Sequence, residues 1–158
     1  KAVYVYIYPN AIKLAGRIRF PQNQDETKFS IHYTLACALL YGSYGIDDME
    51  HMKLSDEMVN LINKIHLISD EAMEDRSKNI RGTRVEIEKR NGEVIKETVL
   101  VPKGDPEKPL DIQDIINKLE ECALGQADQK MIEKLVQIIE EIDGDGEFIN
   151  PIRVTGEL

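Results

Sequence analysis

The chain has 158 residues, of which 42% are hydrophobic, and its 29 acidic and 20 basic residues give a net charge of −9. This length and composition suffice for one domain with its own core, and no apolar run approaches the roughly 20 residues that a membrane-spanning helix needs. The acidic balance argues against binding to nucleic acids or anionic lipids through a basic surface. We therefore expect a soluble domain that binds neither.

The two cysteines, Cys37 and Cys122, both fall within apolar helical patterns and lack the spacing of metal ligands. Such thiols are most often small buried groups in proteins of a reducing compartment. We therefore expect a cytoplasmic protein. The chain begins at Lys1 and passes directly into a strand pattern, which we interpret as part of a longer protein.

A strand pattern opens the chain. Over residues 2–8, Val3, Val5 and Ile7 alternate with tyrosines, which is the period of a β-strand, and Pro9 ends the pattern.

Residues 29–41 predict an uncharged helix with a polar stripe, and Gly42 stands at the position of its C-terminal cap. At 100° per residue the stripe spans roughly a quarter turn, and Leu35 and Leu39 face the other way. The members of the stripe are Ser30, Tyr33, Thr34, Cys37 and Tyr41. Its hydroxyl and thiol groups suit a helix covered on both sides, either by protein or by a bound polar ligand. Such groups also commonly satisfy backbone carbonyls, so a purely structural role stays open.

A second helix follows a polar loop. Ser55 can cap its first amides, and its apolar stripe is predicted to comprise Met58, Leu61, Ile62 and Ile65.

Asn91-Gly92 is the strongest turn signal of the chain and predicts a hairpin between residues 83–87 and 94–101. A two-residue loop would place Ile87 opposite Lys96, whereas a three-residue loop over residues 90–92 places it opposite Ile95. Because the second register pairs two apolar side chains, we favour it.

Two further helices follow the proline-rich connector of residues 102–109. Asp111 and Asp114 open the first, and Asp128 can cap the second, which ends near Asp143. The order of strand, helices, hairpin and helices predicts an α+β fold, with helices packed on one face of a small antiparallel sheet.

Several possible chemical sites have simpler explanations. Residues 141–146 have the spacing of the start of a calcium loop, but Ile152 stands where a bidentate glutamate is needed, so an acidic turn is favoured. Asp48, Glu50 and His51 fit no regular metal site, and a solvated loop is favoured there. His32 and His66 have no adjacent acid that would orient them as bases, which favours structural or surface roles.

Two separated motifs resemble the C-terminal part of the MmgE/PrpD family. Residues 28–42 are similar to its Phe-Ser-x-x-Tyr-x-x-Ala-x-Ala-Leu-x-x-Gly signature, beginning at Phe29. Residues 104–110 are similar to its Gly-Asp-Pro-x-x-Pro segment, and Lys118 matches the lysine of the next helix. The resemblance covers roughly residues 1–124, and the tail after it matches only as a terminal helix.

The resemblance implies an enzyme with a large helical domain and a smaller α+β lid. Residues 1–124 would be the lid, residues 125–158 a C-terminal helix and tail, and the helical domain would be absent from this chain. Family members include 2-methylcitrate dehydratase, cis-aconitate decarboxylase and iminodisuccinate epimerase. They act on polycarboxylates by proton transfer next to a carboxylate, without an essential organic cofactor, and are commonly homodimers. We expect no cofactor and no metal site in this chain.

In that pattern the motif tyrosine faces the cleft between the two domains. It corresponds to Tyr33, with Ser30 one turn before it, so these two residues are the predicted substrate contacts. The family's acid and base residues lie in segments upstream of Lys1, so the catalytic residues are not assigned here.

Two functional hypotheses follow. The first is the lid fragment of a dehydratase, decarboxylase or epimerase that is inactive alone and docks with the helical domain of its parent chain. The second is a non-catalytic interaction or dimerisation module.

Overall fold

The computed structural model describes residues 1–123 and 127–143. The chain divides into two compact units, Lys1–Pro102 and Lys103–Leu158, and each is described by itself. The predicted limit between lid and tail, at residue 124, stays a prediction.

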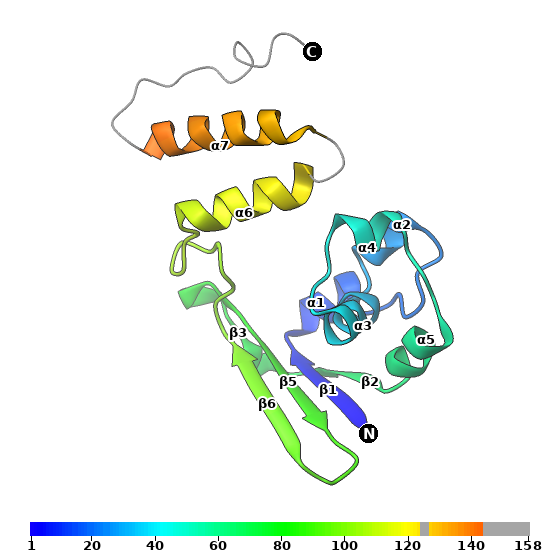
Figure 1. Cartoon of the computed structure of the whole chain (residues 1–158). Helices are drawn as coiled ribbons and strands as arrows, with labels where there is room; N and C mark the ends of the chain where they lie inside the picture. Colours follow the sequence, from blue (N-terminus) through cyan, green and yellow to red (C-terminus); the bar gives the residue numbers. More distant parts are fainter. Residues whose placement is uncertain (124–126, 144–158) are drawn as a thin grey trace. The chain divides into compact units, whose positions relative to one another are not determined.

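The first unit combines a sheet with short helices (Figure 1). Its strands are β1 (Ala2–Ile7), β2 (Ile65–Ser69), β3 (Glu74–Asp75), β4 (Ile80–Arg81), β5 (Thr83–Glu88) and β6 (Val94–Val99). Its α-helices are α1 (Pro9–Ala15), α2 (Gln24–Thr27), α3 (Ile31–Tyr41), α4 (Ile46–Glu50) and α5 (Asp56–Ile62), and two 3₁₀ turns cover Glu71–Met73 and Arg76–Lys78.

The main sheet has the strand order β2-β1-β5-β6, and β3 pairs with β4 in a separate two-stranded sheet. Strand β1 lies at the centre, parallel to β2 and antiparallel to β5. Val5 of β1, for example, stands opposite Leu67 on one side and Val85 on the other. The α+β class is therefore confirmed.

The sheet is mixed, which corrects the prediction of a purely antiparallel one. The error came from Ile65, which was assigned to the stripe of the second helix but opens strand β2. Helix α5 ends at Ile62, and the run that follows is too short for its periodicity to separate helix from strand. Because the helices between β1 and β2 form a crossover, the two strands run in the same direction.

Helices cover one face of this sheet. Val3, Val5 and Ile7 of β1 are buried, whereas the alternate Tyr4 and Tyr6 are only half-buried on the opposite face. Helices α1, α3 and α5 lie on the side of the buried residues (Figure 1). Strand β2 adds Ile65 to the core, and the three helices contribute Ala11, Tyr33, Ala36, Cys37, Met58 and Ile62.

The hairpin has the predicted register. Ile87 stands opposite Ile95, and the loop between Lys89 and Glu93 holds three residues. The amide of Lys89 donates to the carbonyl of Glu93 at 2.8 Å, and Gly92 adopts a positive φ of 86°. The bulged loop is therefore confirmed.

The second unit contains α6 (Ile112–Ala123) and α7 (Gln129–Asp143). Asp111 and Asp114 cap each other's amides at the start of α6, and Asp128 accepts from the Met131 amide at the start of α7. Among the side chains that the structure describes in these two helices, Ile116, Ile132 and Ile138 are buried. The side chains of the acidic turn at residues 141–146 lie outside the described residues.

Among the residues that the structure describes, no helix is long and apolar enough to cross a membrane.

Truncation of Met58 should destabilise the first unit strongly. Its side chain is fully buried between helices and sheet, and Met58→Ala should lower the free energy of unfolding by about 2–5 kcal/mol. The control is Leu14→Ala, since Leu14 is 65% exposed and its loss should cost less than about 0.5 kcal/mol. Denaturant unfolding of both variants measures the difference, and equal losses would contradict the assigned core.

Candidate functional site

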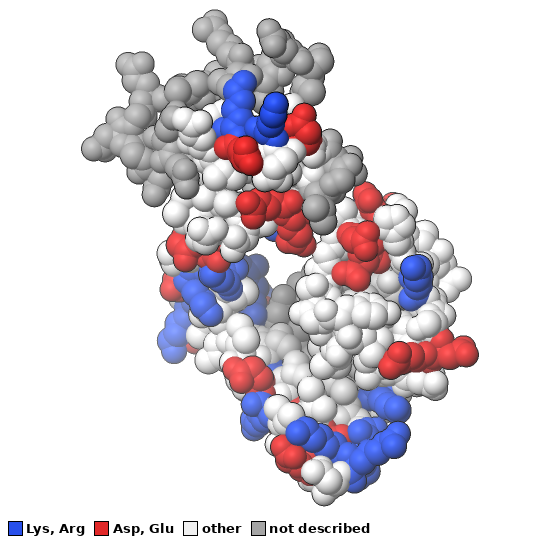
Figure 2. Space-filling model, in the orientation of Figure 1, with Lys and Arg blue, Asp and Glu red and all other residues white. Residues whose placement is uncertain are grey.

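Helix α3 contains no charged residue, and the surface over it carries no charged side chain in the view of Figure 2, while acidic side chains border it near α4. Its polar stripe is not buried uniformly. Ser30, Tyr33 and Cys37 are buried, Thr34 is half-buried, and Tyr41 is exposed. The structure therefore separates the first turns of the stripe, which enter the core, from its last residue.

Ser30 is the N-cap of α3. Its hydroxyl oxygen accepts from the Tyr33 amide at 3.1 Å, and its carbonyl accepts from the Thr34 hydroxyl at 3.1 Å. Ser30 is fully buried by these contacts, so its direct effect is to fix the first turn of the helix. Contact between Ser30 and a substrate remains a prediction.

The hydroxyl group of Tyr33 joins α3 to α4 and to the extended segment after α4. It donates to the carbonyl of Asp48 at 3.1 Å and accepts from the amide of Lys53 at 3.4 Å. The ring meets that of Tyr44 edge to face, with centroids 6.2 Å apart. Burial raises the pKa of Tyr33 to about 12, so its phenol stays protonated at neutral pH.

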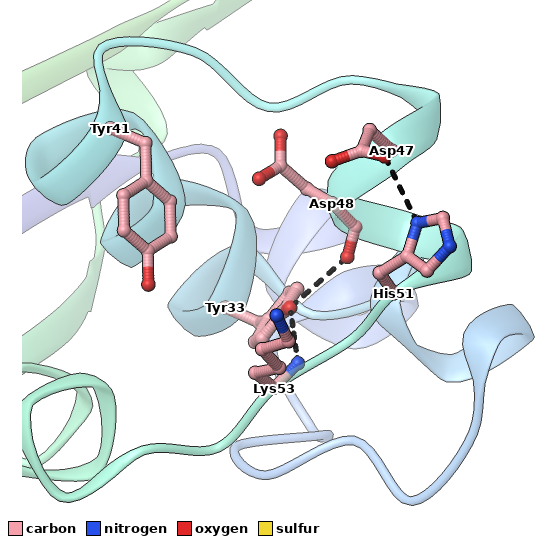
Figure 3. A pocket seen from close by; sticks show the side chains of 6 residues that line it. All are labelled: Tyr33, Tyr41, Asp47, Asp48, His51 and Lys53. Atoms are coloured by element: carbon pink, nitrogen blue, oxygen red, sulfur yellow. Dashed lines mark hydrogen bonds and ion pairs between the residues drawn. The ribbon is translucent and has the colours of Figure 1, made fainter. Parts of the chain in front are cut away.

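A pocket of about 400 Å³ opens beside this hydroxyl (Figure 3). Tyr33 is 2% exposed and forms a buried part of its wall, whereas the other side chains come from the end of α3, from α4 and from the extended segment after it. The lining residues are Tyr33, Tyr41, Asp47, Asp48, His51 and Lys53.

Local contacts engage most of the charged groups around the pocket. Asp47 lies 3.0 Å from Nδ1 of His51, and a carboxylate oxygen of Asp48 accepts from the Gly45 amide at 2.9 Å, which caps α4. Lys53 forms no ion pair with any described residue. Within the described part of the chain, no three His, Cys, Asp or Glu side chains gather in a way that could hold a metal ion.

Of the residues that line the pocket, only Tyr33 was predicted as a substrate contact, and Tyr41 was a member of the polar stripe. The segment of residues 43–53 was interpreted as a loop, and Asp48 and His51 were considered there only as weak metal ligands. One sequence signal for the position of this segment was Gly42. It forms a left-handed cap that ends α3 and turns the chain back beside the helix.

None of the other candidate residues is among those that line the pocket. His66 belongs to β2 and stacks on Tyr4 with ring centroids 5.5 Å apart. In the second unit, Lys118 pairs with Glu121 at 3.0 Å, and Cys122 is exposed.

His32 is buried in the first unit, as a structural role requires. It is 4% exposed, and its Nδ1 atom has no hydrogen-bond partner among the described residues. Burial lowers the pKa of His32 to about 4, and the charge of Arg19 acts in the same direction. In the folded protein, His32 is therefore neutral at neutral pH.

The protonation of His32 should make the stability of the first unit depend on pH. The pKa of 6.5 in the unfolded chain exceeds the folded value of about 4, so the unfolded state binds more protons between these values. The contribution of neutral His32 to the free energy of unfolding should be fully present above pH 6.5. It should decrease as the pH drops toward 4. Urea unfolding across this range should show a smaller slope for His32→Leu than for the native chain, and identical slopes would contradict the assignment.

A comparison with known protein families identifies one family that matches this chain. The model of the MmgE/PrpD C-terminal domain matches residues 1–141, a stretch that includes both motifs and the whole pocket. No curated protein matches the chain. The match extends past the resemblance expected from the motifs, which ended near residue 124. The chain therefore belongs to the MmgE/PrpD family and contains its C-terminal domain.

Proposed function

We propose that this chain is the lid of a two-domain enzyme that dehydrates, decarboxylates or epimerises a polycarboxylate by proton transfer next to a carboxylate. The observation that carries the proposal is the phenol of Tyr33, which stands at the tyrosine position of the family motif and reaches the pocket from the core. Family membership supports the reaction class, and the geometry of Tyr33 supports its role.

Tyr33 donates a hydrogen bond to a carboxylate oxygen of the substrate. A phenol whose pKa is raised to about 12 supplies a proton for hydrogen bonding without adding a negative charge that would repel an anion. The substrate oxygen takes the place of the Asp48 carbonyl, which accepts this proton in the structure. The amide of Lys53 remains a donor to the phenol oxygen and keeps it in position.

Ser30 supports the site through Tyr33. Its hydroxyl oxygen fixes the Tyr33 amide at 3.1 Å, so it holds the first turn of α3 and with it the direction of the phenol. Because Ser30 is fully buried, we assign it to positioning within the substrate-binding pair predicted from the motif.

The remaining chemistry requires groups from a helical domain. Abstraction of a proton next to a carboxylate needs a base, and the developing oxyanion needs positive charge. In the pocket, His51 pairs with Asp47 and Lys53 is exposed, so neither is held as a buried base. We assign both functions to a helical domain upstream of Lys1, and we expect the chain to be inactive alone.

Exposed apolar side chains support a partner domain. Phe29 and Tyr41, which flank the ends of α3, are 54% and 59% exposed, and Leu39 is 38% exposed. Surfaces of this kind commonly become buried in an interface. The helical domain is the partner we propose, and a homodimer in the cytoplasm is the state we expect for the whole enzyme. A dimerisation module without catalysis would use the same surface, and absence of turnover together with self-association would favour it.

Replacement of Tyr33 tests its role in the two-domain protein. Assayed on 2-methylcitrate, cis-aconitate and iminodisuccinate, Tyr33→Phe should lower kcat/KM for the accepted acid by roughly tenfold to a hundredfold. Loss of its two backbone contacts should cost about 0.5–1.5 kcal/mol in the free energy of unfolding.

Tyr4→Phe is the matched control, since Tyr4 lies on the opposite face of the sheet. It should leave activity unchanged. An unchanged rate in Tyr33→Phe would remove Tyr33 from the site, and no turnover of any acid by the native protein would overturn the proposed function.

A second pair of variants separates positioning by Ser30 from general stability. Ser30 and Ser55 cap α3 and α5 in the same way, each accepting from the amide three residues later. Replacement of either by alanine should lower the free energy of unfolding by about 0.5–2 kcal/mol. At a temperature where both variants are folded, only Ser30→Ala should lower kcat/KM, and equal activities would contradict a positioning role.

A further inference from the structure

The pocket beside Tyr33 contains three carboxylate or imidazole groups that are already engaged. Asp47 and His51 pair with each other, and Asp48 accepts from the Gly45 amide at the start of α4. The Asp47 side chain is also 92% exposed, so solvent weakens its field within the pocket. These groups therefore leave little charge directed at a ligand.

Lys53 differs from the other charged residues of the lining. Its ammonium group forms no ion pair with a described residue, although its side chain lines the pocket (Figure 3). Its backbone is fixed, because its amide donates to the Tyr33 oxygen at 3.4 Å. The pocket thus contains the ammonium group of Lys53 and the buried phenol of Tyr33. The backbone amide of Lys53 connects the two residues.

We propose that Lys53 binds a second carboxylate of the substrate while Tyr33 binds the first, so that this pocket selects acids with two or more carboxylates. The inference rests on the proposed function and adds a specificity-determining residue to it. A volume of about 400 Å³ is within the range of small-molecule pockets. The four-carbon stem of lysine allows the ammonium group to follow carboxylates at different separations.

The charge of Lys53 can be tested apart from its backbone contact. Lys53→Met removes the ammonium group and retains the amide that holds the Tyr33 hydroxyl, whereas Lys53→Arg retains the positive charge. Lys64→Met is the matched control, because Lys64 lies in the turn between α5 and β2 and does not line the pocket.

In the two-domain protein, Lys53→Met should raise KM for the accepted polycarboxylate by roughly tenfold and leave kcat within about twofold. Lys53→Arg should stay close to the native KM, and Lys64→Met should match it. The increase should shrink at high salt, where an ion pair with an exposed lysine is screened. An unchanged KM in Lys53→Met, with turnover of polycarboxylates intact, would overturn the inference and leave the proposed function standing.

A titration with citrate decides the role of Lys53 even where turnover is absent. Calorimetry on the two-domain protein should show citrate binding that weakens by roughly tenfold in Lys53→Met and is retained in Lys53→Arg. Equal citrate affinity of the native protein and Lys53→Met, or no citrate binding at all, would overturn the inference. Failure of the whole acid panel to turn over would instead count against the proposed function.

Discussion

The hydrogen bonds of the Tyr33 hydroxyl are the constraint on which the site depends. Helix α3 is capped by a left-handed glycine, and the chain then passes through α4 and an extended segment. From this stretch, Tyr44, Met52 and Leu54 pack against the core. Tyr33 holds this segment at two backbone atoms, the carbonyl of Asp48 and the amide of Lys53. This buried side chain therefore adds a polar link between the helix and the far wall of the pocket to the apolar contacts of the segment.

The rest of the first unit explains why Tyr33 can serve this purpose. Its ring belongs to the core that α1, α3 and α5 build on β1, and Ser30 fixes the turn from which it projects. A side chain held in a packed core has few alternative rotamers, so little entropy is lost when its hydroxyl binds a partner. The burial that stabilises the fold also keeps the phenol protonated, because ionisation of a buried tyrosine is costly.

The sequence predicted those features that depend on contacts between residues close together in the chain. It did not predict the features that depend on contacts between distant residues. The cap at Ser55 and the hairpin register at Ile87 depend on residues close in sequence, and both agree with the structure. Ser30 was predicted inside the helix, whereas it is the N-cap of α3. Strand β2 depends on pairing with β1 across about sixty residues, and no local pattern at Ile65 encodes it. Family motifs located Tyr33, but Lys53 lies outside them and was found only when the fold placed its amide beside the Tyr33 oxygen.

The charges in the pocket indicate which steps the lid could perform and which steps the proposed helical domain would have to perform. Asp47, Asp48 and Lys53 give this wall no net positive charge, so attraction of a polyanion by the lid alone is weak. A phenol and one lysine can still orient an acid, since hydrogen bonds and a single ion pair depend on direction more than on net charge. In the proposed two-domain enzyme, strong electrostatic attraction and proton transfer would belong to the wall that the helical domain supplies. Such a division would make the proposed reaction depend on closure, because only a substrate that contacts both walls would be bound and oriented.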